Sequence, residues 1–473
     1  MAVLEFSKTE LERLLERKLT DDDYKNKIPM IGCPLEKMDA KKVWYEISPN
    51  RPDLYSVEGF ARAMWNFLGL TKDIPVYRID KPRIKVTLTR VEARPYIVAA
   101  IVRNVKLTEG TLLSLIQLQE KLHDTLGRKR KKVAIGIHDS DKVKPPFRYI
   151  AAPPDTSFVP LDKKERMSMR DILKKHPKCK DYAHLVEGYN KFPLIVDKNN
   201  NVLSFPPIIN GELTRLTERT KNLFIDVTGT SELAINQALN IIATALFDRG
   251  CLIEPVKINN KITPNLSTQK MKLDVAYANK LLDLNLSKNE VKSLLAKMCI
   301  SFDGTNAAIP PYRIDVMHQM DLVEELAIAR GYATFEPHLP RVVTIARRDE
   351  MNEFAYFLRK IIIGLGLQEV VTMVLTNRDA QFKNMELHEE QLCETLNALN
   401  AECSACRRAL LPSMLSVLAT NKHREYPHQI FEIGDVVHPD SSEETGARQT
   451  RHLSACISDT SVSYEQIVSV LDS

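Results

Sequence analysis

The sequence predicts a multidomain protein of the α+β class, because short strand-like apolar runs and amphipathic helix-like runs alternate irregularly along a long chain. The chain has 473 residues, and 44% of them are hydrophobic, which is enough to bury several cores. A length of this order corresponds to about two to four domains. Stretches that contain proline divide the chain into four expected modules, 1–75, 83–257, 261–340 and 347–473.

The charge and the cysteine content limit the classes of protein to which the chain can belong. The net charge of +5 is small for this length, so binding to a polyanion such as RNA would depend on local basic patches. The eight cysteines are scattered, no signal-peptide pattern precedes them, and no apolar run is long enough to cross a bilayer. We therefore expect a cytoplasmic protein that has no membrane partner.

The first module is expected to combine short strands with helices. Residues 43–48 are typical of a strand, and a proline-containing break follows them. Asp53 or Ser56 can cap the helix that comes next, whose apolar residues between 60 and 68 recur at the spacing of one helix face. Gly69 supplies a left-handed residue that would end this helix.

The first half of the second module contains a helix between two strands. The strands are expected at 96–102 and 133–138, and the helix at 111–126 carries leucines on one side. Gly127 is expected to end that helix. A run of five basic residues, 128–132, then follows and either contacts RNA phosphates or forms a solvated turn.

A histidine and a polar strand end follow in the same module. His138 with Asp139 resembles half of a catalytic triad, but no nucleophile motif of the G-x-S-x-G kind occurs, which favours a histidine that merely ends a strand. A further strand is expected at 223–227. Asp226 and Thr228 are two residues apart, so both should project to one face at the end of this strand.

Hairpin and helix signals complete the second module and continue into the last two. Asn199, Asn200 and Asn201 predict a hairpin turn, and a helix is expected at 231–248. The third module should contain a helix at 286–299 and a second, acidic helix. The fourth should begin with a helix at 349–363, followed by a glycine turn and a strand at 369–375.

Four carboxylates lie within two helical turns of the third module, namely Asp315, Asp321, Glu324 and Glu325. Acidic side chains at this spacing repel one another unless a helix N-terminus, a basic neighbour or a divalent cation is present. Asp321 and Glu324 have the spacing of a capping pair at a helix start. A hard cation such as Mg²⁺ also prefers carboxylate ligands, so both interpretations stay open at this point.

Six strings, in this order, carry a resemblance to a known family. They are ISPNRPDLYSVEGFARA, RPYIVAAIVRNVKL, LIQLQEKLHDTLGRKRKKVAIGIHD, FPPIINGELTRLTERTKNLFIDVTGT, PPYRIDVMHQMDLVEELAIARGY and NKHREYPHQIFEIGDVV. The chain resembles the β subunits of phenylalanyl-tRNA synthetases of the archaeal and eukaryotic type along essentially its whole length.

The resemblance implies a class II synthetase of two α and two β chains (α2β2), whose α chain uses ATP and Mg²⁺ to charge the phenylalanine tRNA. The β chain then resembles a class II catalytic fold, an antiparallel sheet with flanking helices, that has lost its active site. The segment similar to the ATP-binding motif agrees, since it carries Glu432 and no arginine placed to hold a phosphate. Charging is therefore expected of the partner.

Two sites follow from the resemblance. Asp315, Asp321, Glu324 and Glu325 match the positions at which the family binds Mg²⁺, in a module that resembles a small helical wing-like domain. The module that ends in FIDVTGT is similar to the family's editing domain, which hydrolyses tyrosine wrongly attached to the phenylalanine tRNA. The expected editing residues are Asp226, Thr228, Ser204, Asn210 and Glu212.

Alternatives of other classes remain. The chain could be a non-catalytic scaffold derived from the synthetase that binds RNA or protein, or a free-standing editing hydrolase without an α partner. The intact FPPIINGEL and FIDVTGT strings argue against the first, and the synthetase-like last module argues against the second. The family continues beyond residue 473, so the last module is expected to be incomplete at its C-terminal end.

Overall fold

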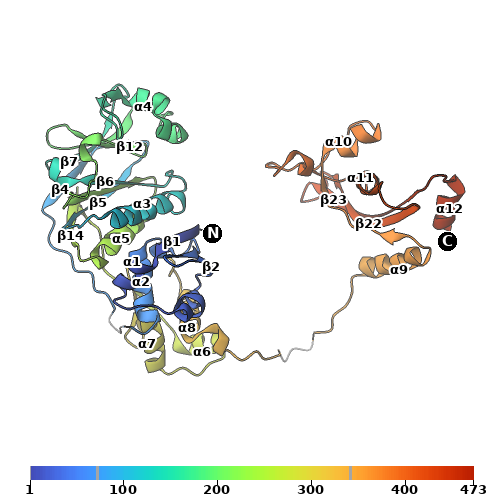
Figure 1. Cartoon of the computed structure of the whole chain (residues 1–473), viewed down its shortest axis with the longest axis horizontal. Helices are drawn as coiled ribbons and strands as arrows, with labels where there is room; N and C mark the ends of the chain where they lie inside the picture. The colour runs from blue at the N-terminus through green and yellow to red at the C-terminus, as the bar shows by residue number, and fades with distance from the viewer. Residues whose placement is uncertain (1, 71–73, 340–343, 473) are drawn as a thin grey trace. The chain divides into compact units, whose positions relative to one another are not determined.

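The computed structural model describes residues 2–70, 74–339 and 344–472. The chain forms two compact units, Met1–His338 and Leu339–Ser473 (Figure 1). Both mix helices with sheets, as predicted. Within the described residues, no helix is both long and apolar enough to span a membrane.

Unit 1 begins with a three-stranded antiparallel sheet and a buried helix. The strand order is β1–β3–β2. Its elements are β1 (Ala2–Ser7), α1 (Lys8–Leu14), η1 (Asp23–Lys27), η2 (Ile28–Ile31), β2 (Leu35–Met38), β3 (Lys42–Ile47), η3 (Pro52–Leu54) and α2 (Val57–Phe67). The hydroxyl oxygen of Ser56 accepts from the backbone N–H of Gly59 at 3.2 Å, so the predicted cap of α2 is confirmed.

A ten-stranded sheet forms the centre of unit 1, in the order β12–β11–β10–β7–β4–β14–β5–β13–β6, with β15 beside β14. Its strands are β4 (Ile84–Leu88), β5 (Tyr96–Arg103), β6 (Val133–Asp139), β7 (Phe147–Ala152), β10 (Phe192–Val196), β11 (Val202–Phe205), β12 (Ile209–Asn210), β13 (Leu223–Gly229), β14 (Leu252–Ile258) and β15 (Lys261–Thr263). Helix α3 (Glu109–Asp124) packs against β6, and α5 (Glu232–Asp248) packs against β5 and β13. The predicted strands and helices of this module are confirmed, and β13 runs two residues further than expected.

The end of α3 differs from the prediction. Gly127 does not take a left-handed conformation. Instead Arg128, Lys129 and Arg130 do so in succession, with φ of 47°, 53° and 64°. Gly127 is needed for space, because an added Cβ would lie 2.5 Å from the carbonyl oxygen of His123. Left-handed non-glycine residues cost about 1–2 kcal/mol each, so surrounding contacts must hold this turn.

An insertion between β7 and β10 has a hydrophobic core of its own. It consists of β8 (Ser157–Phe158), β9 (Met167–Ser168), α4 (Met169–Lys175) and η5 (Pro177–Leu185). The remaining short helices of this module are η4 (Ser140–Lys142) and η6 (Glu212–Thr214). Asn200, with a φ of 66°, lies in the predicted turn between β10 and β11.

The last part of unit 1 adds a small sheet, β16–β18–β17, and three helices. Its elements are β16 (Gln269–Lys272), α6 (Val275–Leu282), α7 (Lys288–Lys297), β17 (Ser301–Phe302), β18 (Asn306–Ile309), α8 (Gln319–Arg330) and η7 (Tyr332–Thr334). One hydrophobic core runs from the first sheet through the ten-stranded sheet to α8. The parts of unit 1 are therefore packed as one body.

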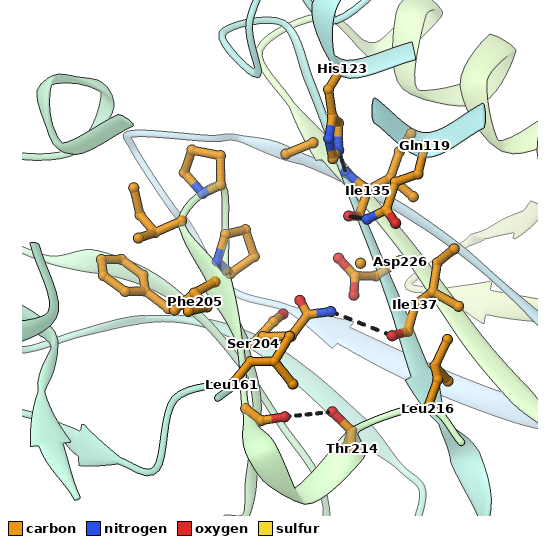
Figure 2. A pocket seen from close by; sticks show the side chains of 18 of the residues that line it. Gln119, His123, Ile135, Ile137, Leu161, Ser204, Phe205, Thr214, Leu216 and Asp226 are labelled. Carbon is orange, nitrogen blue, oxygen red and sulfur yellow. Dashed lines mark hydrogen bonds between the residues drawn. The ribbon is translucent and has the colours of Figure 1, made fainter. Parts of the chain in front are cut away.

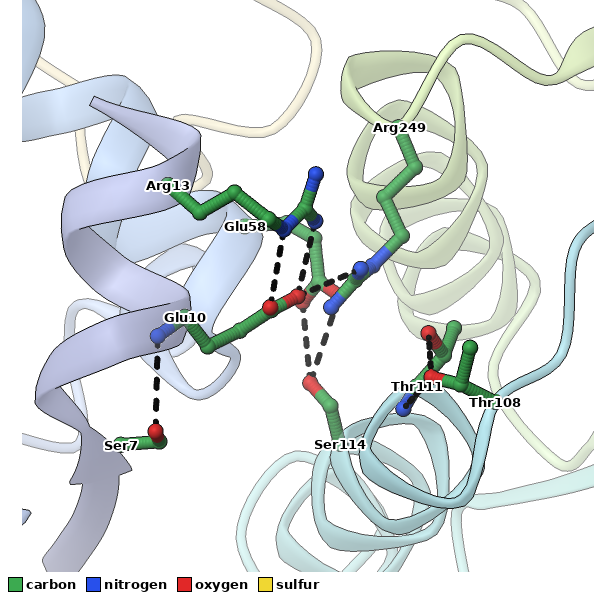
Figure 3. Close-up of polar contacts among 8 residues, drawn as sticks. All are labelled: Ser7, Glu10, Arg13, Glu58, Thr108, Thr111, Ser114 and Arg249. Atoms are coloured by element: carbon green, nitrogen blue, oxygen red, sulfur yellow. Dashed lines mark hydrogen bonds and ion pairs between the residues drawn. The ribbon is translucent and has the colours of Figure 1, made fainter. Parts of the chain in front are cut away.

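A polar network also joins these parts (Figure 3). The carboxylate of Glu10 on α1 binds Arg13 at 2.9 Å and Arg249, which follows α5, at 2.7 Å. Arg249 also pairs with Glu58 on α2, and Glu58 accepts at 3.0 Å from the hydroxyl of Ser114 on α3. Four helices that lie far apart in the sequence are thus tied together.

Unit 2 contains a three-stranded sheet, β19–β22–β23, in which β22 and β23 are antiparallel and β19 is parallel to β22. Its elements are α9 (Glu350–Gly364), β19 (Gln368–Glu369), β20 (Leu375–Thr376), α10 (Arg378–Gln381), η8 (Lys383–Met385), η9 (Ala401–Cys403), β21 (Ala405–Cys406), α11 (Leu411–Asn421), β22 (His428–Pro439), β23 (Ala447–Ser458) and α12 (Tyr464–Asp472). The predicted helix at 349–363 is confirmed. The continuous strand expected at 369–375 is wrong, because only its two ends pair, with β22 and with β21.

Candidate functional site

A cavity of about 430 Å³ opens between α3, β6 and the β11–β12 hairpin (Figure 2). Most of its wall is apolar. The apolar side chains include Leu112, Ile116, Ile135, Ile137, Phe205 and Leu216. A few polar groups converge among them, an arrangement typical of small-molecule sites, whose volumes are about 300–1,000 Å³.

Asp226 supplies the buried carboxylate of this cavity. It lies on β13, between β5 and the edge strand β6, directly opposite Gly136 on β6, and is 1% exposed. Its Oδ1 lies 2.7 Å from Nε2 of His138, whereas its Oδ2 is buried and has no hydrogen-bond partner. A buried carboxylate oxygen without a partner is costly, so Oδ2 is poised to accept a hydrogen bond from a ligand or water.

His138 is held at both ring nitrogens. Its Nδ1 lies 2.8 Å from the hydroxyl of Thr214, which is on η6, and the side chain is fully buried. His138 does lie at the end of β6, as expected, and two elements distant in sequence also bind it. No local signal in the sequence marks its contact with Asp226, which depends on the register between β6 and β13.

Two further sequence candidates line the cavity with Asp226. The buried hydroxyl of Ser204, on β11, has no hydrogen-bond partner. Asn210, on β12, donates from its amide to the carbonyl of Ile137 at 3.4 Å. The structure thus brings together Asp226, Ser204 and Asn210 from three strands. Figure 2 shows Asp226 and Ser204 on facing walls of the cavity.

The other two candidates lie outside this cavity wall. Thr228 accepts a hydrogen bond on its hydroxyl from Nε of Arg94 at 3.2 Å, and its carbonyl accepts from the same guanidinium at 2.7 Å. Glu212 turns to Arg215 at 2.7 Å and accepts at 3.0 Å from the backbone N–H of Asp162. Both side chains therefore support the surrounding loops, and neither meets the cavity.

Arg94 also holds the left-handed turn after α3. Its guanidinium donates to the carbonyl oxygens of Arg130 at 3.0 Å and Lys131 at 3.3 Å. Burial lowers the pKa of Arg94 to about 10, so the group still carries its charge at neutral pH. Sequence reasoning did not single out Arg94, because nothing in the residues around it indicates this long-range contact.

The basic run is only partly available to an anion. Arg130 points inward, donates to Glu120 at 3.1 Å and to the carbonyl of Pro207 at 3.3 Å, and stacks over the ring of Tyr182. It therefore braces the cavity wall between α3 and the loop before β12. Arg130 is therefore not available to a phosphate in this arrangement, so the five basic residues cannot all contact RNA. Lys129 stays exposed.

Helix α3 contributes a second buried histidine. Nε2 of His123 accepts from the backbone N–H of Ile135 at 2.8 Å, and its Nδ1 lies 3.3 Å from Glu120. Burial lowers the pKa of His123, and the hydrogen bond with His123 lowers the pKa of Glu120. A neutral imidazole and a charged carboxylate therefore form this side of the cavity.

The acidic cluster of the third module is arranged around an arginine. Arg313, almost fully buried, contacts Asp315 at 2.8 Å and Glu325 at 2.6 Å. Burial opposes the charge of this guanidinium, yet Glu325 and Asp315 raise the pKa of Arg313 well above its usual value. A basic neighbour was one of the alternatives that the sequence left open for this cluster, and Arg313 is that neighbour. It neutralises two of the four expected Mg²⁺ ligands.

The remaining two acids have other contacts. Asp321 accepts from the backbone N–H groups of Met317 and His318, both at 2.7 Å, and is the N3 residue of a capping box whose N-cap is His318. Glu324 accepts from the hydroxyl of Tyr332 at 2.6 Å. Among the residues that the structure describes, no group of three or more acids, histidines or cysteines is placed to hold a metal ion. Asp315 and Glu325 are bound by Arg313, so the four carboxylates do not form the joint Mg²⁺ site that the resemblance implied.

Comparisons with known proteins place these features in one family. A model described as the B3/4 domain matches residues 93–256, one described as the tRNA synthetase B5 domain matches 271–332, and one described as the phenylalanyl tRNA synthetase beta chain CLM domain matches 336–472. The chain is 41% identical to the phenylalanine–tRNA ligase beta subunit of Archaeoglobus fulgidus, covering 97% of this chain and 84% of that protein. It is 40% identical to the Methanocaldococcus jannaschii subunit of the same name, covering 100% of this chain and 88% of that protein.

A solved structure agrees. An N-terminal fragment of the phenylalanyl-tRNA synthetase beta subunit from Pyrococcus horikoshii matches with a TM-score of 0.67 and 39% identity, covering 70% of this chain and 99% of the fragment. The chain belongs to the phenylalanyl-tRNA synthetase β-subunit family. The cavity lies within the region that matches the B3/4 domain, and the acidic cluster lies within the region that matches the B5 domain.

The segment that was predicted to be similar to an ATP-binding motif lies on β22. Its Glu432 is buried and accepts from Arg407 at 2.7 Å and from the hydroxyl of Thr372 at 2.7 Å. Arg407 also donates to the carbonyl of Asp435 at 2.9 Å and is itself buried. Arg407 is therefore held by internal contacts and is not presented to a phosphate.

Proposed function

We propose that this chain is the β subunit of a phenylalanine–tRNA ligase, and that it hydrolyses tyrosine wrongly attached to the phenylalanine tRNA in the cavity around Asp226. The observation that carries the proposal is the buried, unpartnered Oδ2 of Asp226 inside an otherwise apolar cavity. Membership of the family supports the link to phenylalanine and its tRNA.

The need for such a site follows from the energetics of recognition. A pocket shaped for a phenyl ring rejects an added hydroxyl by only about a hundredfold. A second pocket that hydrogen-bonds the hydroxyl discriminates far better, because the analogue without it leaves a buried polar group unpaired. Correction by hydrolysis at a second site therefore complements charging.

The depth of Asp226 decides its role in this proposal. The ester of an aminoacyl-tRNA is tethered to the tRNA and must stay near the cavity mouth, whereas the tip of its side chain reaches inward. Asp226 is 1% exposed, so Oδ2 is placed to accept from the tyrosine hydroxyl. Ser204, also buried and unpartnered, lies on the neighbouring wall.

Hydrolysis then requires an oriented water at the ester. The water oxygen attacks the carbonyl carbon, the bond to the ribose oxygen breaks, and the released ribose hydroxyl takes up a proton. No free nucleophile is needed among the cavity residues, and binding energy at the side chain positions the ester. Asn210 lies at the wall formed by β12 and is the polar candidate for contact with the bound group.

Deacylation of the phenylalanine tRNA charged with tyrosine tests the proposal. Asp226→Asn should slow deacylation at least about tenfold, because the charged acceptor for the hydroxyl is lost. Glu212→Gln serves as the control outside the cavity and should keep the rate. An Asp226→Asn variant that deacylates at the original rate would remove Asp226 from the site.

Charging itself is assigned to an α-chain partner, which would use ATP, in a complex proposed to contain two chains of each kind. The internal use of Arg407 by Glu432 supports this assignment, since the motif offers no free arginine for a phosphate. In unit 2, helix α9 exposes several large apolar side chains, which supports a protein partner. The fold of this unit is proposed to be an inactive class II catalytic-like domain at 347–473.

The other modules complete the proposal. Residues 83–257 form the editing-like domain, 1–75 a supporting module, and 261–340 a small wing-like domain. Mg²⁺ binding in the last of these stays a prediction, and only Asp321 and Glu324 have an oxygen free of Arg313 to offer it. No step of hydrolysis in this chain is assigned to the metal. The expected compartment is the cytoplasm, where the free cysteines would stay reduced.

A further inference from the structure

We propose that His138 is a positioning residue for this hydrolysis: it grips one oxygen of Asp226 and so fixes the other oxygen toward the cavity. The inference rests on the proposed function. His138 is fully buried and is not part of the cavity wall, so it acts on a substrate only through Asp226.

The imidazole of His138 is fixed from two sides. Its Nε2 lies 2.7 Å from Oδ1 of Asp226 on β13, and its Nδ1 lies 2.8 Å from the hydroxyl of Thr214 on η6. Rotation of the ring would break both contacts inside a region closed to water. His138 therefore transmits the position of η6, at the cavity wall, to the carboxylate of Asp226.

The hydroxyl of Thr214 can bind His138 in more than one way. It lies 2.8 Å from Nδ1 of His138, 3.3 Å from the carbonyl of Gly211 and 3.5 Å from that of Leu203. A hydroxyl both donates and accepts, so Thr214 can bind Nδ1 whether or not this nitrogen carries a hydrogen. Nε2 lies 2.7 Å from Oδ1 of Asp226, and it donates there because a carboxylate oxygen accepts.

Gly136 makes this geometry possible. It lies opposite Asp226 in the β6–β13 ladder, and an added Cβ would be 2.4 Å from Oδ1 of Asp226 and 2.8 Å from Nε2 of His138. The space that a side chain would fill is occupied by the hydrogen bond between the two residues. With Oδ1 held there, the carboxylate cannot turn to find a partner for Oδ2 elsewhere, and Oδ2 stays aimed at the cavity.

A purely structural role is the alternative, because His138 also stacks near the ring of Phe224. The two roles differ in their coupling to Asp226. A positioning residue has nothing left to position once Asp226 is removed, whereas a packing residue continues to contribute. A double-mutant cycle separates them.

The experiment uses the full chain co-expressed with a phenylalanyl-tRNA synthetase α chain, and phenylalanine tRNA charged with tyrosine as the probe. It measures kcat and KM for deacylation, and Tm, for His138→Gln, His138→Asn, Asp226→Ala and the double variant His138→Asn with Asp226→Ala. The glutamine amide nitrogen can reach the position of Nε2 and donate to Asp226, whereas the shorter asparagine cannot. Thr220→Val is the matched control, since it removes a buried hydrogen bond of 2.8 Å to Asp139 outside the cavity.

We expect kcat/KM of His138→Asn to fall about ten- to hundredfold, the value of a hydrogen bond to a charged group, and that of His138→Gln to fall less than about threefold. In the Asp226→Ala background, His138→Asn should add less than about twofold. Thr220→Val should keep the original kcat/KM. Should His138→Asn not fold, His138→Gln alone decides, and a rate below about a tenth of the original contradicts the inference.

Three results would overturn the inference: unchanged deacylation in His138→Asn, equal losses in the asparagine and glutamine variants, or independent losses from His138 and Asp226. In each of these cases Asp226→Ala still slows the reaction, so the proposed function survives. If the unmodified complex fails to deacylate the mischarged tRNA, or Asp226→Ala does not slow it, the proposed function is wrong and the inference falls with it.

Discussion

Gly136 is the residue whose missing side chain the cavity depends on. An added Cβ would lie 2.4 Å from Oδ1 of Asp226, closer than any stable contact. Gly136→Ala should therefore displace the carboxylate, slow deacylation of the tyrosine ester at least about tenfold, and destabilise the fold by about 1–3 kcal/mol. Deacylation rate and Tm measure the two effects. Gly110→Ala is the control, because its nearest neighbour would be 4.0 Å away, and it should keep the deacylation rate without lowering Tm, since alanine is favoured over glycine in a helix.

Glu325 and Glu324 are neighbours in sequence, but changing each to glutamine should lower the free energy of unfolding by very different amounts. Glu325→Gln leaves the buried Arg313 with Asp315 as its remaining carboxylate partner and should cost about 3 kcal/mol. Glu324→Gln removes only an exposed contact with Tyr332 and should cost less than about 0.5 kcal/mol. Denaturant unfolding measures both, with Mg²⁺ present and after chelation.

The metal dependence of these two variants separates an ion pair from a metal site. The cost of Glu325→Gln should be the same with and without Mg²⁺, since its partner is a guanidinium. A cost that appears only when Mg²⁺ is present would restore Glu325 as a metal ligand and contradict the arrangement around Arg313. The sequence pattern alone could not decide between an ion pair and a metal site, because both need the same acidic residues. Arg313 lies before the helix, so the helical spacing of the acids gives no sign of it.

Some of the site residues could be predicted from the sequence and others could not, depending on whether their contacts are local or long-range. Asp226 could be predicted, since alternation along a strand gives the face of each side chain. His138 could not, because its contact with Asp226 depends on the register between β6 and β13, which no local pattern encodes. Thr228 shares the face of Asp226 and was expected beside it, but Arg94, 134 residues away in sequence, binds its hydroxyl.

At the scale of elements, the network of Glu10, Arg249 and Glu58 makes the packing of helices sensitive to pH (Figure 3). The hydrogen bond with Arg13, against the opposing effect of burial and with help from Arg249, lowers the pKa of Glu10 from 4.5 to about 2. Between these two values the unfolded chain binds more protons than the folded chain. The contribution of Glu10 is therefore complete above about pH 5 and is lost as the pH falls toward about 2.

Glu10→Gln should accordingly lower the free energy of unfolding by about 1–2 kcal/mol at pH 7, after allowance for solvent screening, and by less as the pH falls. Urea unfolding of both chains between pH 7 and pH 3 measures the difference. Glu5→Gln is the control, because its pair with Lys42 is exposed on both sides and should contribute less than about 0.5 kcal/mol. A difference for Glu10→Gln that grows toward acid pH would contradict the assignment.

The elements themselves were largely predictable where caps and periodicity agree. Helices α2 and α5 begin after Ser56 and Ser231 as expected, since each serine hydroxyl accepts from the backbone N–H three residues later. The prediction of one strand at 369–375 is wrong because an apolar run does not specify which strand it pairs with. Only the two ends of this run pair with other strands. The prediction for the end of α3 is wrong because Arg94 stabilises a left-handed turn that the local residues do not favour.

At the scale of the molecule, the three expected modules of unit 1 share one core and several long-range polar contacts. Arg62 of α2 pairs with Asp248 of α5 at 2.7 Å, and Asn66 donates to the carbonyl of Ala296 in α7 at 2.9 Å. Within unit 1, the module boundaries predicted from prolines therefore do not separate independent hydrophobic cores. Variants in this unit should be tested for stability in the whole chain for the same reason.

Unit 2 presents the clearest surface for the proposed α-chain partner, because α9 exposes Phe354 and Phe357 to 57% and 60%. Exposed aromatic side chains of this size are typical anchors of an interface, and each is worth about 2 kcal/mol or more when it is a hot spot. Changing both to lysine should therefore reduce co-purification with the α chain at least about thirtyfold while the Tm of the chain stays constant. Leu396→Lys with Leu399→Lys is the matched control, since both leucines are fully exposed on a loop, and it should leave co-purification intact. Equal recovery of the α chain with both double variants would mean that α9 does not face the partner.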